Sequence, residues 1–136
     1  MRAILFFTLA TFAVGIAMLQ SQSIGAAAGE QSEELLRHLV LYKFKAEVTP
    51  EQVQEVIHAF ASLPKQIDTI VGFEHGPNVN QEGKSDGLTY GFVVTFQSQA
   101  DLDAYIKHPA HQAYVNIVKD RREKVVVFDY WVNAAG

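Results

Sequence analysis

The segment from residue 98 to residue 118 carries more side chains that could transfer a proton than any other segment of similar length. It holds four polar aromatic side chains: Tyr105, His108, His111 and Tyr114. Pro109 fixes the backbone where two helices are predicted to meet, so the imidazoles on either side are held in a defined relation. A histidine in the first turn of a helix lies beside free backbone N–H groups, which favour its neutral form. His111 is therefore a candidate general base near neutral pH.

Tyr105 is predicted to lie on the apolar stripe of the preceding helix, six residues before His111. Its hydroxyl could polarise a carbonyl group or hold a phenolic ligand while His111 accepts the proton. A structural interpretation is equally physical, because buried tyrosine and histidine side chains often only pack and satisfy backbone carbonyl groups. The sequence leaves both interpretations open.

Metal or cofactor chemistry has little support in the sequence. His108 and His111 are three residues apart, but no carboxylate pattern completes a zinc or iron site, and Pro109 disturbs the helical face that such a pair needs. The chain has no glycine-rich phosphate loop and no Gly-x-Ser-x-Gly elbow. We therefore expect neither a metal nor a cofactor. A histidine in an apolar strand, such as His38, is more often a structural hydrogen-bonding group than a functional residue.

The first 28 residues have the pattern of a secretory signal peptide. Arg2 supplies the positive start, residues 3–19 are almost wholly apolar, and small residues end the segment at Ala28. Cleavage after Ala28 predicts an exported protein, periplasmic or secreted, without membrane attachment. The alternative is an uncleaved anchor helix, because the apolar run approaches the roughly 20 residues that span a bilayer. Residues 29–36 are predicted to be a short tether.

The composition of the remaining chain indicates one acidic domain without disulfides. Removing residues 1–28 removes one base and no acid, which leaves ten bases against fifteen acids and a net charge of −5. An acidic balance argues against a nucleic-acid partner, because phosphate binding needs clustered lysine and arginine. The chain contains no cysteine, which excludes thiol catalysis and thiolate metal sites.

Hydrophobic periodicity predicts a domain over residues 37–132. Strands are predicted at residues 37–45, 71–79, 88–96 and 124–132. A helix is predicted to begin at Thr49-Pro50 and another at Ser98, and Pro109 divides the second one. The order strand, helix, strand, strand, helix, strand predicts an α+β, ferredoxin-like βαββαβ fold with its helices on one face of an antiparallel sheet.

The last predicted strand is apolar on both of its faces. Val125, Val127 and Trp131 lie on one side, and Val126, Phe128, Tyr130 and Val132 lie on the other. Helices can cover only one face of the sheet, so the other face would stay exposed in a monomer. We therefore predict a homodimer closed sheet against sheet.

Four segments resemble the stress-responsive A/B barrel domain family. They are RHLVLYKFK (37–45), the strand at 88–96, YIKHPAH (105–111) and VFDY (127–130). The resemblance covers about residues 37–132. It implies a dimeric α+β barrel of the olivetolic acid cyclase-like kind.

The resemblance also implies roles for particular residues. In a cofactor-free aldol cyclase of this family, a helix tyrosine and the second histidine of His-Pro-x-His form the catalytic centre, and these positions are Tyr105 and His111 here. The pocket histidine of the first strand corresponds to His38. A pocket histidine of the third strand is Tyr90 here, which changes the pocket wall. We expect His38, Tyr90 and His108 to contribute to ligand binding.

Three functions follow as expectations. The first is a stress-associated homodimer that binds a small apolar or phenolic molecule. No reaction is assigned to it, as for many family members. The second is a cofactor-independent lyase, cyclase or monooxygenase in which His111 is the base and Tyr105 the hydrogen-bond donor. The third is a purely structural dimer.

Overall fold

The computed structural model describes residues 34–134. The predicted signal peptide (1–28) and the first five residues of the predicted tether lie outside the described residues. Within residues 34–134, no helix is long and apolar enough to cross a membrane.

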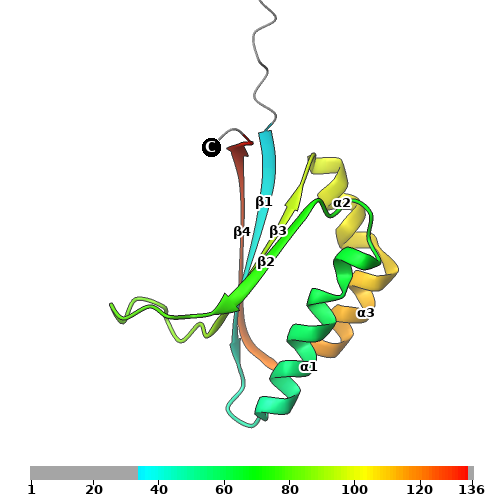
Figure 1. Cartoon of the computed structure of the whole chain (residues 1–136). Coiled ribbons are helices and arrows are strands. Elements are labelled where there is room, and N and C mark those ends of the chain that lie inside the picture. Colours follow the sequence, from blue (N-terminus) through cyan, green and yellow to red (C-terminus); the bar gives the residue numbers. More distant parts are fainter. Residues whose placement is uncertain (1–33, 135–136) are drawn as a thin grey trace, which may run out of the picture. The chain divides into compact units, whose positions relative to one another are not determined.

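The described residues form a four-stranded antiparallel sheet with all helices on one face (Figure 1). The elements in chain order are β1 (Glu34–Phe44), α1 (Pro50–Ala61), the 3-10 turn η1 (Leu63–Lys65), β2 (Gly72–Pro77), β3 (Tyr90–Phe96), α2 (Gln99–Lys107), α3 (Pro109–Val118) and β4 (Arg122–Asn133). The strand order is β2-β3-β1-β4, and each neighbouring pair is antiparallel. The predicted α+β, ferredoxin-like fold is confirmed.

Local sequence signals set the helix boundaries as expected. The Thr49 hydroxyl accepts a hydrogen bond from the Gln52 N–H at 3.3 Å, and the Gln52 side chain accepts one from the Thr49 N–H at 3.0 Å. This is the capping box that begins α1. Ser98 caps α2 through the Asp101 N–H at 3.1 Å, and Pro109 begins α3.

The boundaries of all four strands differ from the prediction by up to three residues. β1 begins at Glu34, three residues early, because residues 34–36 pair with residues 131–133 of β4. Leu36 is only 2% exposed, so this part of the predicted tether belongs to the sheet and contributes to the core. β4 is also longer than predicted, beginning at Arg122 and ending at Asn133.

The hydrophobic core lies between the helices and one face of the sheet. Phe60 of α1 is 1% exposed, and its ring lies 4.3 Å from that of Phe92 and 4.6 Å from that of Tyr114, measured between centroids. These contacts join α1, β3 and α3. The polar aromatic side chains of α2 and α3 pack against this aromatic cluster.

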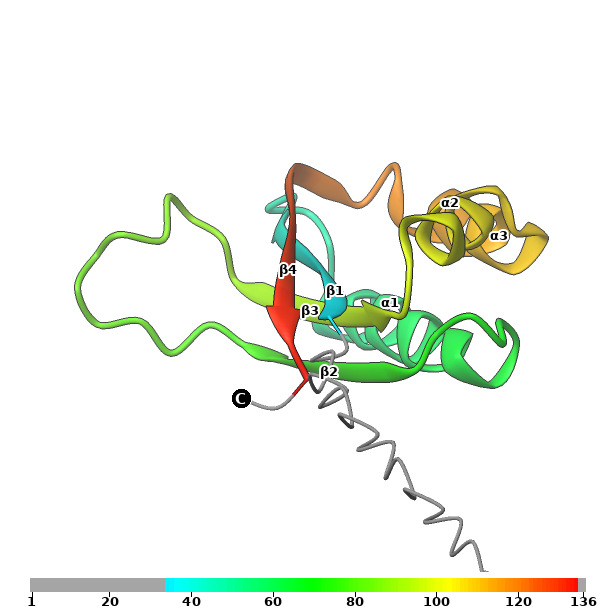
Figure 2. The same cartoon turned by 90° about the horizontal axis from the view of Figure 1, so that it is seen from above.

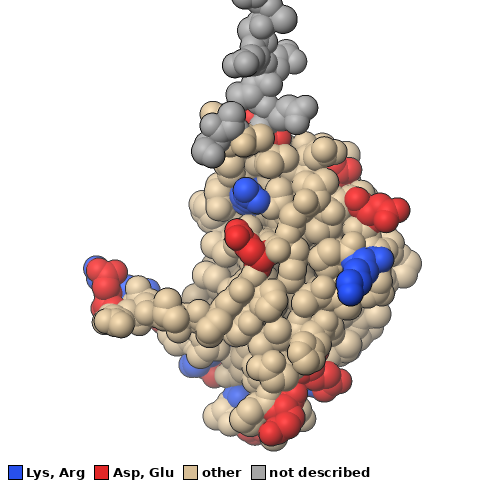
Figure 3. Space-filling model, viewed as in Figure 1, with Lys and Arg blue, Asp and Glu red and all other residues tan. Residues whose placement is uncertain are grey.

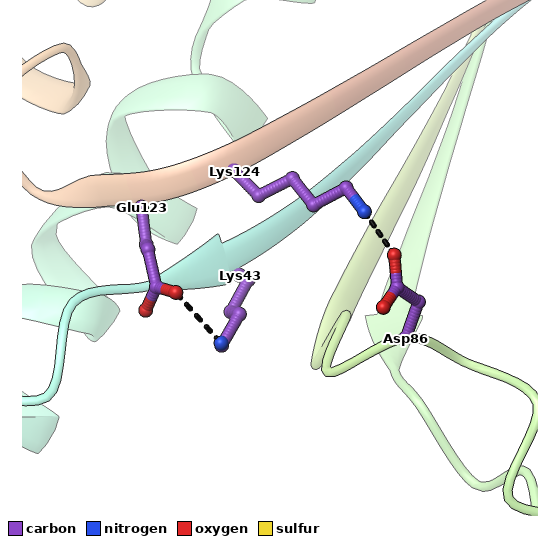
Figure 4. Close-up of polar contacts among 4 residues, drawn as sticks. All are labelled: Lys43, Asp86, Glu123 and Lys124. Atoms are coloured by element: carbon purple, nitrogen blue, oxygen red, sulfur yellow. Dashed lines mark hydrogen bonds and ion pairs between the residues drawn. The ribbon is translucent and has the colours of Figure 1, made fainter.

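The other face of the sheet is not covered by helices, and residues 78–89 project from that side (Figure 2). We call these residues the arm. An ion pair between Asp86 of the arm and Lys124 of β4 ties the arm to the sheet, and Lys43 pairs with Glu123 beside it at 2.7 Å (Figure 4). Exposed apolar side chains occur on both faces of β4: Phe128 and Tyr130 on the open face, and Val127 and Trp131 on the helix side.

Charged side chains are sparse on the face of the molecule seen in Figure 3. The basic side chains there are separated from one another, and acidic side chains lie among them. This face has no continuous basic surface of the kind that binds nucleic acid.

Candidate functional site

Three of the predicted site residues come together between the sheet and the helices. Tyr105 lies on α2, His111 in the first turn of α3 and His38 in the middle of β1. The ring centroids of Tyr105 and His111 are 4.4 Å apart, and those of His38 and Tyr105 are 5.8 Å apart. The fold therefore assembles two imidazoles and one phenol from three elements.

His111 is held in one tautomer by the backbone of α2. Its Nδ1 lies 3.0 Å from the carbonyl oxygen of Ile106. A carbonyl oxygen only accepts hydrogen bonds, so Nδ1 carries the proton and Nε2 keeps its lone pair. Burial lowers the pKa of His111; the bond to Ile106 opposes this shift, and the neighbouring His38 adds to it. The neutral form of the His111 imidazole is therefore favoured over the protonated form, and burial is the largest cause of the lowered pKa.

The lowered pKa of His111 predicts a pH dependence of stability. The unfolded chain binds a proton near the ordinary value of 6.5, whereas folded His111 resists protonation until lower pH. The unfolded state therefore binds more protons below pH 6.5, and this contribution to the unfolding free energy is lost as pH falls. We expect His111→Gln to lose less stability than the wild type between pH 7.5 and 5. Urea unfolding at four pH values measures this difference, and parallel curves for the two proteins would contradict it.

Tyr105 is available as a hydrogen-bond donor. Its side chain is 1% exposed, and burial together with the nearby Tyr42 raises the pKa of its hydroxyl. The hydroxyl thus stays protonated at physiological pH. Within residues 34–134 no group makes a hydrogen bond with this hydroxyl, so it could donate one to a ligand.

His38 is oriented by an acidic residue of the neighbouring strand. Its Nδ1 lies 2.6 Å from Oδ1 of Asp129, its cross-strand neighbour on β4. An ionised carboxylate only accepts, so Nδ1–H donates and the imidazole is fixed in the sheet. The sequence prediction did not include Asp129, although it lies in the VFDY segment. Only the register between β1 and β4 reveals the pairing.

Removing the Asp129 carboxylate is expected to destabilise the protein. Asp129→Ala would leave the N–H of the buried His38 without its acceptor, which costs about 1–3 kcal/mol. Asp129→Asn keeps a carbonyl oxygen at the same place and should retain most of that stability. Urea unfolding of both variants measures the effect. Equal losses of unfolding free energy in Asp129→Ala and Asp129→Asn would show that Asp129 does not stabilise the protein through its hydrogen bond to His38.

A cavity of about 220 Å³ lies beside Tyr105 and His111. Its polar wall also includes Tyr42, Tyr114 and Arg122, and its apolar wall comes from β1, β4, α1 and α3. The Tyr114 hydroxyl donates to the Tyr42 hydroxyl at 3.0 Å. Tyr42 and Arg122 were not predicted as site residues, although Tyr42 shares a strand face with His38 and alternation alone could have suggested it.

None of the three predicted ligand-binding residues, His38, Tyr90 and His108, lines this cavity. The His108 Nδ1 accepts a hydrogen bond from the Ala110 N–H at 3.1 Å, so His108 caps α3. The Tyr90 hydroxyl lies 2.8 Å from Nδ1 of His75, and Tyr90 lines a larger hollow of about 610 Å³ at the base of the arm. That hollow contains none of the other predicted site residues. Residues 34–134 hold no cluster of three or more His, Asp or Glu side chains arranged for a metal ion.

Comparison with known proteins places the chain in a family. A family model described as "Stress responsive A/B Barrel Domain" matches residues 36–132. The stress-response A/B barrel domain-containing protein HS1 of Arabidopsis thaliana is 35% identical over 101 residues, which is 74% of this chain and 93% of that protein. Olivetolic acid cyclase of Cannabis sativa is 34% identical over 95 residues, covering 70% and 94% of the two chains.

Solved structures share the fold. A dimeric ferredoxin-like protein of unknown function from Jannaschia sp. CCS1 is 33% identical, with a TM-score of 0.63 over 72% of this chain and 99% of that one. A hydroxynitrile lyase from Passiflora edulis has a TM-score of 0.70 over 75% and 96% of the two chains; at 24% identity it shows the fold alone. On the family match and the curated relatives, this chain belongs to the stress-responsive A/B barrel domain family.

Proposed function

We propose that this protein binds a small one-ring compound in the cavity beside Tyr105 and His111. The observation that carries the proposal is the pairing of a free phenol donor with a free imidazole acceptor in one cavity. A cavity of about 150 Å³ can hold benzene, so 220 Å³ suits one substituted ring. The space is smaller than the roughly 300–1,000 Å³ of sites for drug-sized ligands.

A second candidate function is proton transfer without a cofactor, as a lyase- or cyclase-type enzyme. The observation that favours it is the tautomer of His111, whose unprotonated Nε2 is available as a base. The Tyr105 hydroxyl would donate a hydrogen bond to a carbonyl oxygen of the ligand, and Nε2 would take a proton from the adjacent carbon. The enolate that forms keeps its negative charge on the oxygen held by Tyr105. The name of the cyclase relative is consistent with such a step.

Titration with 4-hydroxyacetophenone tests the binding function. This probe has one ring, a phenol and a carbonyl group. Tyr105→Phe removes only the hydroxyl and is expected to weaken binding about three- to tenfold, the usual value of one neutral hydrogen bond. Tyr90→Phe removes a hydroxyl outside the cavity and serves as the matched control. Chemical shifts in NMR spectra report affinity and location; equal affinity for both variants would contradict the proposed site.

We also propose that the functional unit is a homodimer closed through the open sheet faces. Phe128 is 60% and Tyr130 42% exposed on that face, and exposed apolar surface of this kind favours a partner. The solved relative from Jannaschia is described as dimeric. These observations support the arrangement.

A charge on the open face is expected to prevent this assembly. Phe128→Asp would place a carboxylate in an apolar interface, and we expect it to shift the mass from dimer to monomer at micromolar concentration. Gln54→Asp adds the same charge on the exposed side of α1 and should leave the mass unchanged. Size-exclusion chromatography with light scattering measures both. A monomeric wild type would refute the dimer.

Export of the protein remains a proposal that rests on its first 28 residues. Intact mass spectrometry of the protein recovered from cells that express the full sequence shows at which residue the recovered chain begins. A chain that begins at Gly29 supports cleavage, whereas a retained leader supports an anchor.

A further inference from the structure

Arg122 is the only cationic side chain in the wall of the 220 Å³ cavity. It is the first residue of β4 and pairs across the sheet with Phe44, on the side that faces the helices. Its guanidinium lies near the two linked hydroxyls of Tyr42 and Tyr114. Burial raises the pKa of both tyrosines, and Arg122 opposes that shift in both.

Three basic residues beside Arg122 have acidic partners. Arg121 pairs with Glu55 at 2.8 Å. Lys43 pairs with Glu123, and Lys124 with Asp86 (Figure 4). Arg122 makes no ion pair within residues 34–134, and no carboxylate lines the cavity. A partly buried guanidinium without a counter-ion is costly, so this arrangement suits an anion supplied by a ligand.

The two tyrosine hydroxyls add a hydrogen-bond donor at the same place. Tyr42 and Tyr114 share a single hydrogen bond of 3.0 Å, although each hydroxyl carries a hydrogen. One of these two hydrogens therefore has no acceptor within the described residues. Together, this hydroxyl hydrogen and the five N–H groups of the Arg122 guanidinium give this side of the cavity several hydrogen-bond donors and no negatively charged group.

We propose that the ligand of this cavity is a small carboxylic acid whose carboxylate is bound by Arg122 and the Tyr42–Tyr114 pair. The inference rests on the proposed binding function and adds the chemical class of the ligand. A planar guanidinium binds a planar carboxylate through two parallel hydrogen bonds. The remaining wall is apolar and suits a ring, and Tyr105 and His111 then face the other polar group of the ligand.

A matched pair of probes tests the proposal. 4-Hydroxybenzoate and 4-hydroxybenzamide have nearly the same shape, but only the first is an anion at pH 7.5. We expect the wild type to bind the acid at least about tenfold more tightly than the amide, because a charge-assisted pair is worth more than a neutral hydrogen bond. Arg122→Gln should abolish this preference and change the affinity for the amide by less than twofold. Arg121→Gln removes the same charge one residue away and should retain the preference.

Two further measurements keep the test independent of how well Arg122→Gln folds. Arg122→Lys keeps the charge but loses the planar fork, so it should retain a reduced preference for the acid. In the wild type, acid binding should weaken between 50 and 500 mM NaCl while amide binding stays constant.

The outcomes separate this inference from the proposed function. Equal binding of acid and amide, or a preference that survives in Arg122→Gln, overturns the carboxylate assignment while leaving the cavity as a binding site. Absence of binding by the acid, the amide and 4-hydroxyacetophenone overturns both. A preference that also disappears in Arg121→Gln would mean that net charge alone attracts the acid, and would overturn the assignment to Arg122.

Discussion

His111→Ala is expected to slow proton abstraction from a bound ketone by a factor of about 10² to 10⁴, the usual contribution of a positioned general base. The variant removes the only imidazole in the cavity wall and leaves Tyr105 and the Tyr42–Tyr114 pair in place. Because His111 Nδ1 is held by the Ile106 carbonyl, the neutral ring presents the same nitrogen, Nε2, to the ligand. The lowered pKa of His111 keeps that nitrogen unprotonated near neutral pH.

Deuterium exchange makes this measurement possible without knowledge of the complete reaction. In D₂O, the methyl hydrogens of 4-hydroxyacetophenone exchange each time the adjacent carbon loses a proton, and NMR spectroscopy records the loss of signal. His58→Ala, on the exposed side of α1, is the matched control and should exchange at the wild-type rate. If His111→Ala binds the ketone and exchanges its hydrogens as fast as the wild type, His111 is not the base, and binding alone remains as the proposed function.

Phe60→Ala is expected to reduce the unfolding free energy by about 3–5 kcal/mol, the usual range for a buried phenylalanine. Phe60 is 1% exposed and contacts three aromatic rings, those of Phe73, Phe92 and Tyr114. These rings belong to β2, β3 and α3, so no single neighbour can move to fill the space. A domain with a typical stability of about 5–15 kcal/mol would lose a large fraction of it.

Urea unfolding followed by far-UV circular dichroism measures the loss. Val79→Ala, on the arm where the side chain is 83% exposed, should change the unfolding free energy by less than about 0.5 kcal/mol. Phe60→Leu retains most of the buried volume and should cost clearly less than Phe60→Ala. A loss below about 1.5 kcal/mol for Phe60→Ala would mean that the aromatic cluster repacks. Since Phe60 also lines the cavity, the binding of one-ring probes should weaken in parallel.

The sequence by itself determined the elements and the fold class. The capping box at Thr49, the cap at Ser98 and the break at Pro109 act within a few residues, so they can be read directly from the chain. Apolar periodicity identified the four strands, and their order with the helices limited the topology to the ferredoxin-like arrangement. The cluster of Tyr105 and His111 was also predictable, because these residues lie six positions apart on consecutive helices.

The tertiary structure alone decided the partners of those side chains. Asp129 meets His38 from 91 residues away, because the register of β1 on β4 aligns them. The same register extends β1 to Glu34, and a register shift between Lys43 and Phe44 places Arg122 opposite Phe44, beside the cavity. Tyr90 meets His75 instead of the cavity because β2 pairs with β3. Short-range signals act through local backbone energetics, whereas a polar site depends on which distant atoms the packed sheet and helices bring within hydrogen-bond distance.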